Sequence, residues 1–190
     1  MLLYDVPDDH LAALTKITDQ SIKLDNIEGN LAPILNNIQC KDLFILNMEI
    51  EKKYFDEVTM KTKTCNVHLT NLKGDLLPAF KALNVQKLVL KDISINTPVT
   101  KQLLKMLNCN VKELEMNSGV SFNPSILFNY SGEGACKSMI FRGNTKSEYY
   151  EEADSWFSEI GWSHESGSNY SKFERLESFH RSNQFHFAVY

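Results

Sequence analysis

The sequence predicts an α/β fold: an irregular leucine-rich-repeat-like solenoid with a parallel sheet, helices on one face, and a C-terminal helix plus β-hairpin cap. Three observations lead to this prediction. A short strand-like unit recurs along the chain, helical patterns separate its copies, and the recurrence stops near residue 146. A strand and a helix repeated every roughly 20 to 29 residues is the period of a leucine-rich repeat.

The recurring unit is clearest in "NVQKLVLKD" at 84–92 and "NVKELEMNS" at 110–118. Each copy ends in an anchor residue, and the anchors are Asn26, Asn47, Asn71, Asp92, Ser118 and Gly143, at spacings of 21, 24, 21, 26 and 25. The positions four and two residues before each anchor are all apolar: Ile22/Leu24, Leu43/Ile45, Val67/Leu69, Leu88/Leu90, Leu114/Met116 and Met139/Phe141. Such alternation predicts six strands, each with one buried face. We expect the anchor side chains to bond to the backbone where the chain leaves each strand.

Helical spacing of apolar residues lies between the strands, at 33–38, 54–58, 76–83 and 99–107. Two further helix starts are indicated where a side chain able to cap a helix precedes a proline, at Thr97-Pro98 and Asn123-Pro124. Each strand–helix unit is too small to bury its apolar side alone. We therefore expect stacked units that share one sheet and one helix layer.

The last part of the chain departs from the repeat. Residues 147–160 have the pattern of an amphipathic helix, 161–172 read as a polar Gly/Ser loop, and 173–190 look like two strands joined around 181–183. We predict a repeat domain at 1–146 and a helix-and-hairpin cap at 147–190, within one compact body. The cap would cover the final sheet edge, which is otherwise prone to aggregation.

Composition narrows the classes of partner. The formal charge of −4 and the mixed signs argue against nucleic acid, and no segment resembles a signal peptide or a membrane helix. We expect a cytoplasmic or nuclear protein with no membrane partner.

The widely spaced cysteines, Cys40, Cys65, Cys109 and Cys136, argue against disulfides. They precede the anchors by six to nine residues, so we expect them to pack between the layers.

No grouping of residues indicates chemistry. Cys65 and His68 resemble half a zinc site, but no second pair follows at ligand spacing. We therefore predict no catalytic, metal-binding or cofactor-binding residues, no cofactor, and no enzymatic activity. A hydrolase remains the alternative if histidines converge on a carboxylate; the candidates are His68, His164, His180 and His186.

The strand residues between the buried ones should point to the open sheet face. They form two rows: Lys23, Phe44, His68, Val89, Glu115 and Ile140, then Asp25, Leu46, Thr70, Lys91, Asn117 and Arg142. Phe44, Leu46, Val89 and Ile140 are apolar where a solvent-facing row should be polar, which is typical of a binding surface. The twelve residues are thus the predicted protein-binding site. The alternative is that the terminal hairpin or a further domain covers them.

Strands such as "NVKELEMN", followed by a terminal helix and a segment of the type "HRSNQFHFAVY", resemble the F-box-associated region of the large nematode F-box families. The resemblance covers 21–190, with Arg-Ser-Asn where the family has Arg-Ser/Lys-Asp-Gly. It implies a region that selects substrates, while an N-terminal F-box recruits the ubiquitin-ligase core. The opening "MLLYDVPDDHLAALTKITD" is too short for an F-box. We expect either a truncated relative or one that does not join the ligase.

These observations predict a non-enzymatic protein–protein interaction module that binds a protein partner on the open sheet face. The alternative implied by the resemblance is the substrate-recognition part of an F-box-type ubiquitin ligase adaptor. Its partners would then include ubiquitin-ligase components.

Overall fold

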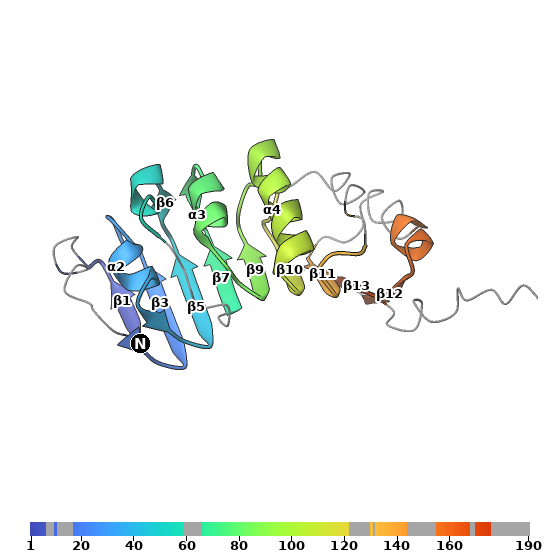
Figure 1. Cartoon of the computed structure of the whole chain (residues 1–190), viewed down its shortest axis with the longest axis horizontal. Helices are drawn as coiled ribbons and strands as arrows, with labels where there is room; N and C mark the ends of the chain where they lie inside the picture. Colours follow the sequence, from blue (N-terminus) through green and yellow to red (C-terminus); the bar gives the residue numbers. More distant parts are fainter. Residues whose placement is uncertain are drawn as a thin grey trace, which may run out of the picture.

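The computed structural model describes residues 1–6, 10, 17–58, 66–121, 130, 132–143, 155–167 and 170–175. These residues form an α/β fold with a large, mostly parallel sheet of nine strands (Figure 1). In spatial order the strands are β1 (Leu2–Tyr4), β3 (Ser21–Asp25), β5 (Asp42–Leu46), β7 (Asn66–Thr70), β9 (Lys87–Lys91), β10 (Glu113–Met116), β11 (Ser138–Arg142), β13 (Tyr170–Arg175) and β12 (Trp162–Gly167). The α/β class predicted from the sequence is confirmed.

The first seven of these strands are parallel and follow one another in sequence order. The last two are antiparallel to their neighbours. Small parallel pairs accompany the main sheet: β2 (Ile17–Thr18) with β4 (Ile38–Gln39), and β6 (Glu49–Ile50) with β8 (Lys73–Gly74). The six predicted strands thus lie side by side in one direction.

The apolar pairs of the six predicted strands align across the sheet and form its inner face. One inner row is Ile22, Leu43, Val67, Leu88, Leu114 and Met139, and the other is Leu24, Ile45, Leu69, Leu90, Met116 and Phe141. Every one of these side chains is 2% exposed or less. The period of two places these residues on one face, and the hydrophobic effect then buries that face against the helices.

The helices lie side by side along one side of the sheet (Figure 1). They are α2 (Ala32–Leu35), the 3-10 helix η1 (Lys52–Tyr54), α3 (Leu77–Ala82) and α4 (Thr97–Cys109). Their apolar residues, including Ile34, Phe80 and Leu103, join the inner rows in one buried cluster. The helix predicted at 54–58 does not form: the 3-10 helix η1 already ends at Tyr54. Thr97 is the first helical residue rather than the cap, because the Asn96 side chain accepts a hydrogen bond from the Val99 N–H at 3.1 Å. The predicted start at 123–124 lies outside the described residues.

The anchors adopt the left-handed backbone region, with φ of 52° at Asn26, 53° at Asn47, 51° at Asn71 and 51° at Asp92. Asn and Asp tolerate this conformation better than other side chains. The side chains of Asn71 and Asn47 bond to each other, and Asn47 also bonds to Asp25, the residue before the anchor Asn26. These bonds run across the repeats rather than to the backbone as predicted. Asn71 Nδ2 donates to Asn47 Oδ1 at 2.9 Å, and Asn47 Nδ2 donates to Asp25 Oδ1 at 2.8 Å. In the next turn the left-handed residue is Gly119, not Ser118; a Cβ at Gly119 would lie 1.9 Å from Asp92 Oδ1.

The described part of the main sheet has one parallel strand more than predicted. β1 pairs with β3, and Asp5, which follows β1, takes the same left-handed conformation with φ of 47°. Asn26 Nδ2 donates to Asp5 Oδ1. The spacing from Asp5 to Asn26 is 21 residues, as between two other pairs of anchors, and Leu3 stands two residues before Asp5. This signal was present in the sequence.

A hairpin forms where a loop was predicted. β12 and β13 pair with each other, so the prediction of a loop at 161–172 is wrong, and β13 also pairs with β11. Trp162, Ser171 and Phe173 are its buried side chains. A hairpin that extends a sheet in its own plane needs few apolar residues, which explains why a polar segment forms strands. The second half of the predicted hairpin, 176–190, lies outside the described residues, and of the predicted helix only 155–159 is described, as helix. The domain division at residue 146 stays a prediction.

Candidate functional site

The face opposite the inner rows, here called the outer face, carries all twelve residues of the predicted site. The first cross-strand row runs from β3 to β11 in the predicted register: Lys23, Phe44, His68, Val89, Glu115 and Ile140. In the second row Asp25, Leu46, Thr70 and Lys91 are register partners on β3 to β9, Asn117 directly follows β10, and Arg142 lies on β11. Eleven of the twelve side chains are exposed or half-buried. The described hairpin β12/β13 continues the sheet and so does not cover these rows. Their role in binding stays a prediction.

Val89 is the exception, because only 7% of it is exposed. Its partners in the register are His68 on β7 and Glu115 on β10. Side chains directly opposite one another on neighbouring strands pack together, so these longer residues cover the shorter valine. The expectation that Val89 is an exposed apolar residue is therefore wrong.

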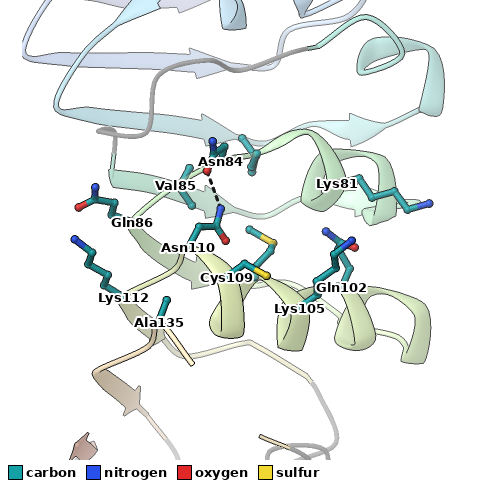
Figure 2. A pocket seen from close by; sticks show the side chains of 12 residues that line it. Lys81, Asn84, Val85, Gln86, Gln102, Lys105, Cys109, Asn110, Lys112 and Ala135 are labelled. Carbon is teal, nitrogen blue, oxygen red and sulfur yellow. Dashed lines mark hydrogen bonds between the residues drawn. The ribbon is translucent and has the colours of Figure 1, made fainter. Parts of the chain in front are cut away.

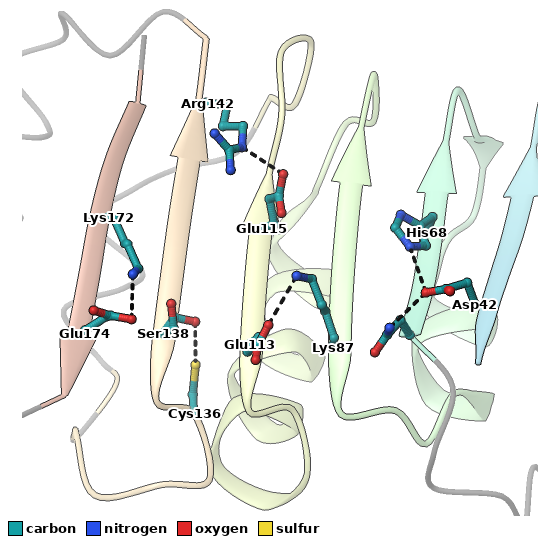
Figure 3. Close-up of polar contacts among 11 residues, drawn as sticks. Asp42, His68, Lys87, Glu113, Glu115, Cys136, Ser138, Arg142, Lys172 and Glu174 are labelled. Atoms are coloured by element: carbon teal, nitrogen blue, oxygen red, sulfur yellow. Dashed lines mark hydrogen bonds and ion pairs between the residues drawn. The ribbon is translucent and has the colours of Figure 1, made fainter. Parts of the chain in front are cut away.

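An aromatic pair occupies the middle of the first outer row. The rings of Phe44 and His68 stack with centroids 4.2 Å apart and planes inclined by 15°, and Lys23 Nζ lies 5.5 Å from the Phe44 ring. His68 Nε2 is 3.8 Å from Asp42 Oδ1 (Figure 3). Burial lowers the pKa of His68, an effect that the nearby Asp42 carboxylate partly opposes. The imidazole is therefore neutral near pH 7 and presents an apolar ring face.

The outer face continues onto β1, which the sequence reading missed. Leu2 pairs with Lys23 in the register and Tyr4 pairs with Asp25. Both Leu2 and Tyr4 are 59% exposed, the highest values for large apolar side chains in the described part of the chain. Together with Phe44 and Leu46 they make this half of the face rich in exposed apolar surface. Exposed apolar surface of this kind marks interaction sites.

The other half of the outer face is a set of paired charges (Figure 3). Lys87 Nζ lies 3.2 Å from Glu113 Oε2, Arg142 Nε lies 2.9 Å from Glu115 Oε1, and Lys172 Nζ lies 2.7 Å from Glu174 Oε1. Beside them the Tyr170 hydroxyl donates to Glu165 Oε1 at 2.6 Å. These charges already have partners within the chain, so they have less to gain from an external ligand.

A groove of about 510 Å³ lies where α3 and α4 lead into β9 and β10 (Figure 2). Lys81, Lys105 and Lys112 are on its rim, and Asn110 Nδ2 donates to Asn84 Oδ1 at 2.9 Å inside it. Basic and amide side chains can bind an anion. Against this, the groove lies at the C-terminal ends of both helices, where the helix dipole is negative.

The cysteines differ from one another in burial. Cys136 is fully buried as predicted, and burial raises the pKa of its thiol to about 12. Cys40 is half-buried, whereas Cys109 is exposed beside the groove, so the expectation that Cys109 packs between the layers is wrong. Cys109 ends a helix on its solvent side, a position that its distance from the anchor does not reveal. Cys65 lies outside the described residues.

Within the described ranges, no three His, Cys, Asp or Glu side chains are placed to share a metal ion. His68 lies on the outer face, whereas His164 stacks on the buried Phe173 with ring centroids 4.5 Å apart. These two histidines therefore do not converge in one cleft. His180 and His186 lie outside the described residues.

In the part of the chain that the structure describes, the helices are too short or too polar to cross a membrane. No family model matches the chain. Comparisons with curated proteins and with solved structures also give no match.

Proposed function

We propose that this chain is an irregular leucine-rich-repeat-like solenoid that works as a non-enzymatic protein-interaction module and binds a protein partner on its outer face. The observation that carries the proposal is the set of accessible apolar side chains on that face: Leu2 and Tyr4 on β1, and Phe44 and Leu46 on β5, on either side of the charged residues of β3. On a sheet face in contact with water, these outward-pointing positions normally carry polar residues.

The rigidity of the sheet supports a binding role. Each outer side chain is attached to a strand whose backbone is paired on both sides from β3 to β11. A surface held in this way loses little conformational entropy when a partner binds, so more of the contact energy appears as affinity. The Phe44–His68 stack also holds two rings in place before any partner arrives.

The proposal is tested by affinity capture from an extract of the source organism, with the captured proteins identified by mass spectrometry. Phe44→Ala removes the ring at the centre of the apolar half, while Lys101→Ala removes an exposed side chain from α4 and serves as the control. We expect a protein captured by the wild type and by Lys101→Ala to be lost with Phe44→Ala. The melting temperature of Phe44→Ala should fall by only a few degrees, because Phe44 is half-buried. An identical set of captured proteins for all three chains would refute the proposal.

The resemblance to the F-box-associated region supports a more specific role, the substrate-recognition part of a ubiquitin ligase adaptor. That role requires the ligase's bridging subunit to co-purify with the full-length protein. Failure to co-purify under conditions where another F-box protein succeeds would reject this role and leave the interaction module in place.

A further inference from the structure

Two lysines flank the patch formed by Phe44, Leu46 and His68 on the outer face, and they differ from the other cations of that face. Lys87, Arg142 and Lys172 each form an ion pair. Lys23 and Lys91 are exposed, and neither makes a hydrogen bond or an ion pair through its side chain with any described residue. Lys23 Nζ lies 5.5 Å from the Phe44 ring. With respect to the described residues, neither ammonium group has to break a hydrogen bond or an ion pair to meet a ligand.

The carboxylates of the same region are already engaged. Asp25 Oδ1 accepts a hydrogen bond from Asn47 Nδ2 at 2.8 Å, and Asp42 Oδ1 accepts one from Asn66 Nδ2 at 2.8 Å. Both acids lie at the margins of the apolar patch formed by Phe44, Leu46 and His68. Both acids keep their negative charge, but each already accepts a hydrogen bond, whereas the two lysines donate none through their side chains to any described residue.

The register gives the distance between the two lysines. Lys23 lies on β3 and Lys91 on β9, with β5 and β7 between them. Three steps of about 4.8 Å across the sheet, with an offset of two residues of about 3.3 Å each along the strands, place their backbones about 16 Å apart. An extended peptide rises about 3.3 Å per residue, so it covers this span in about five residues. The apolar patch lies between the two lysines.

From this arrangement we propose that the outer face binds an extended protein segment that carries two acidic residues, about four to six positions apart, with an aromatic or aliphatic residue between them. This inference rests on the proposed function and names the chemistry of its partner. The acidic residues pair with Lys23 and Lys91, and the apolar residue packs on Phe44, Leu46 and the neutral ring of His68. The segment crosses the strands, so its side chains rather than its backbone provide recognition.

The first test is selection of a random dodecapeptide display library on the folded wild-type chain. We expect the enriched peptides to carry Asp or Glu at a spacing of four to six, flanking Phe, Tyr, Trp, Leu or Ile. Enrichment of basic peptides, enrichment without this spacing, or no enrichment would overturn the inference.

The second test is a charge exchange with the best enriched peptide, measured by fluorescence anisotropy. The double variant Lys23→Glu/Lys91→Glu should weaken binding about tenfold or more, since two exposed attractions become repulsions. A peptide in which both acids are replaced by lysine should recover affinity for the double variant to within about threefold of the original pair. The matched control Lys101→Glu makes the same charge change on α4 and should leave binding unchanged. Equal binding by the wild type and the double variant would overturn the inference.

Phe44→Ala separates the two proposals. If Phe44→Ala abolishes peptide binding while the charge exchange has no effect, the outer face still binds partners and the acidic character is wrong. If neither change affects binding, both proposals fail. Each variant is first compared with the wild type by melting temperature, and Phe44→Leu, which keeps an apolar side chain, replaces Phe44→Ala if the latter does not fold.

Discussion

The inner and outer faces of the sheet are built from alternate residues of the same strands, yet their surroundings differ. Side chains of the inner rows are 2% exposed or less, whereas eleven of the twelve outer-row residues are exposed or half-buried. Leu69 and Thr70 are neighbours in sequence and lie on opposite faces. The residues that stabilise this fold therefore alternate along each strand with the residues that are accessible on the outer face. Each set can therefore be changed while the other stays intact.

The largest expected effect comes from a cavity on the inner face. Leu69→Ala should lower the free energy of unfolding by about 2–5 kcal/mol, because Leu69 is fully buried. Thr70→Ala on the adjacent outer position should cost about 0.5 kcal/mol or less. Urea unfolding followed by circular dichroism measures both values. Similar losses at the two positions would remove the distinction between the faces.

The anchor ladder should come next in size. Asn47 has φ of 53°, and its side chain shares hydrogen bonds with Asp25 and Asn71. Asn47→Ala loses both bonds and places alanine in the left-handed region, for a total cost of about 2 kcal/mol. Asn47→Gly loses the same bonds without the steric cost and should be about 1 kcal/mol more stable than Asn47→Ala in urea unfolding. If alanine were the better tolerated residue, the left-handed turn would not constrain this position.

Val89 tests the difference between the two faces, because it belongs to the outer row but is buried. Val89→Thr keeps the shape of the side chain and adds a hydroxyl, so a buried site should lose about 1 kcal/mol of unfolding free energy. The reciprocal exchange Thr70→Val, at a half-buried outer position, should change stability by less than about 0.5 kcal/mol. Chemical denaturation of both variants side by side tests this. No loss with Val89→Thr would mean that the position is solvated after all.

The smallest expected effect concerns the dependence of folding stability on pH. Burial lowers the pKa of His68 below its usual value, and the charged groups that act on it are Asp42, Lys87 and Glu115. Below the unfolded-state pKa of about 6.5, the unfolded chain binds a proton at His68 more readily than the folded chain does. The stability contributed by the neutral ring is therefore present above that pH and is lost as the pH falls through the window between the unfolded and the folded pKa.

Melting temperatures of the wild type and His68→Gln, measured between pH 7.5 and 5, test this expectation. The wild type should lose more stability than His68→Gln as the pH falls, because only the wild type has an imidazole to protonate. Parallel curves would show that His68 contributes nothing to the pH dependence.

The inner rows could be predicted because their signal is local. Residues such as Leu88 and Leu90 alternate within five positions, and that alternation alone places them on a buried face. The hairpin could not be predicted in the same way. Trp162 and Phe173 are its buried aromatic residues, and the polar residues around them look like a loop until β11 is available as a partner. The pairing is a tertiary effect that overrides local preference.

The same alternation predicts which residues lie on the outer face. It does not predict which of these residues contact one another. That Phe44 and His68 share a row follows from the repeat, since the anchors that follow them are 24 residues apart. Side-chain conformations across the strands decide which cations form an ion pair with a carboxylate. Lys87 reaches Glu113, whereas Lys91, four residues later on the same strand, has Thr70 as its register partner on β7. The cover over Val89 likewise depends on the lengths of its neighbours.

The anchors repeat at distances between 21 and 26 residues, yet every strand from β3 to β11 keeps its place in the register. In the connections that are described throughout, the difference in length falls in the helical segment: the 21-residue spacing from Asn71 to Asp92 contains the short α3, and the 26-residue spacing from Asp92 to Ser118 contains the long α4. The outer residues of one strand can therefore be exchanged, and a connection lengthened or shortened, without shifting the register of the strands on either side. A protein built in this way can acquire a new binding preference through a few substitutions confined to a single strand.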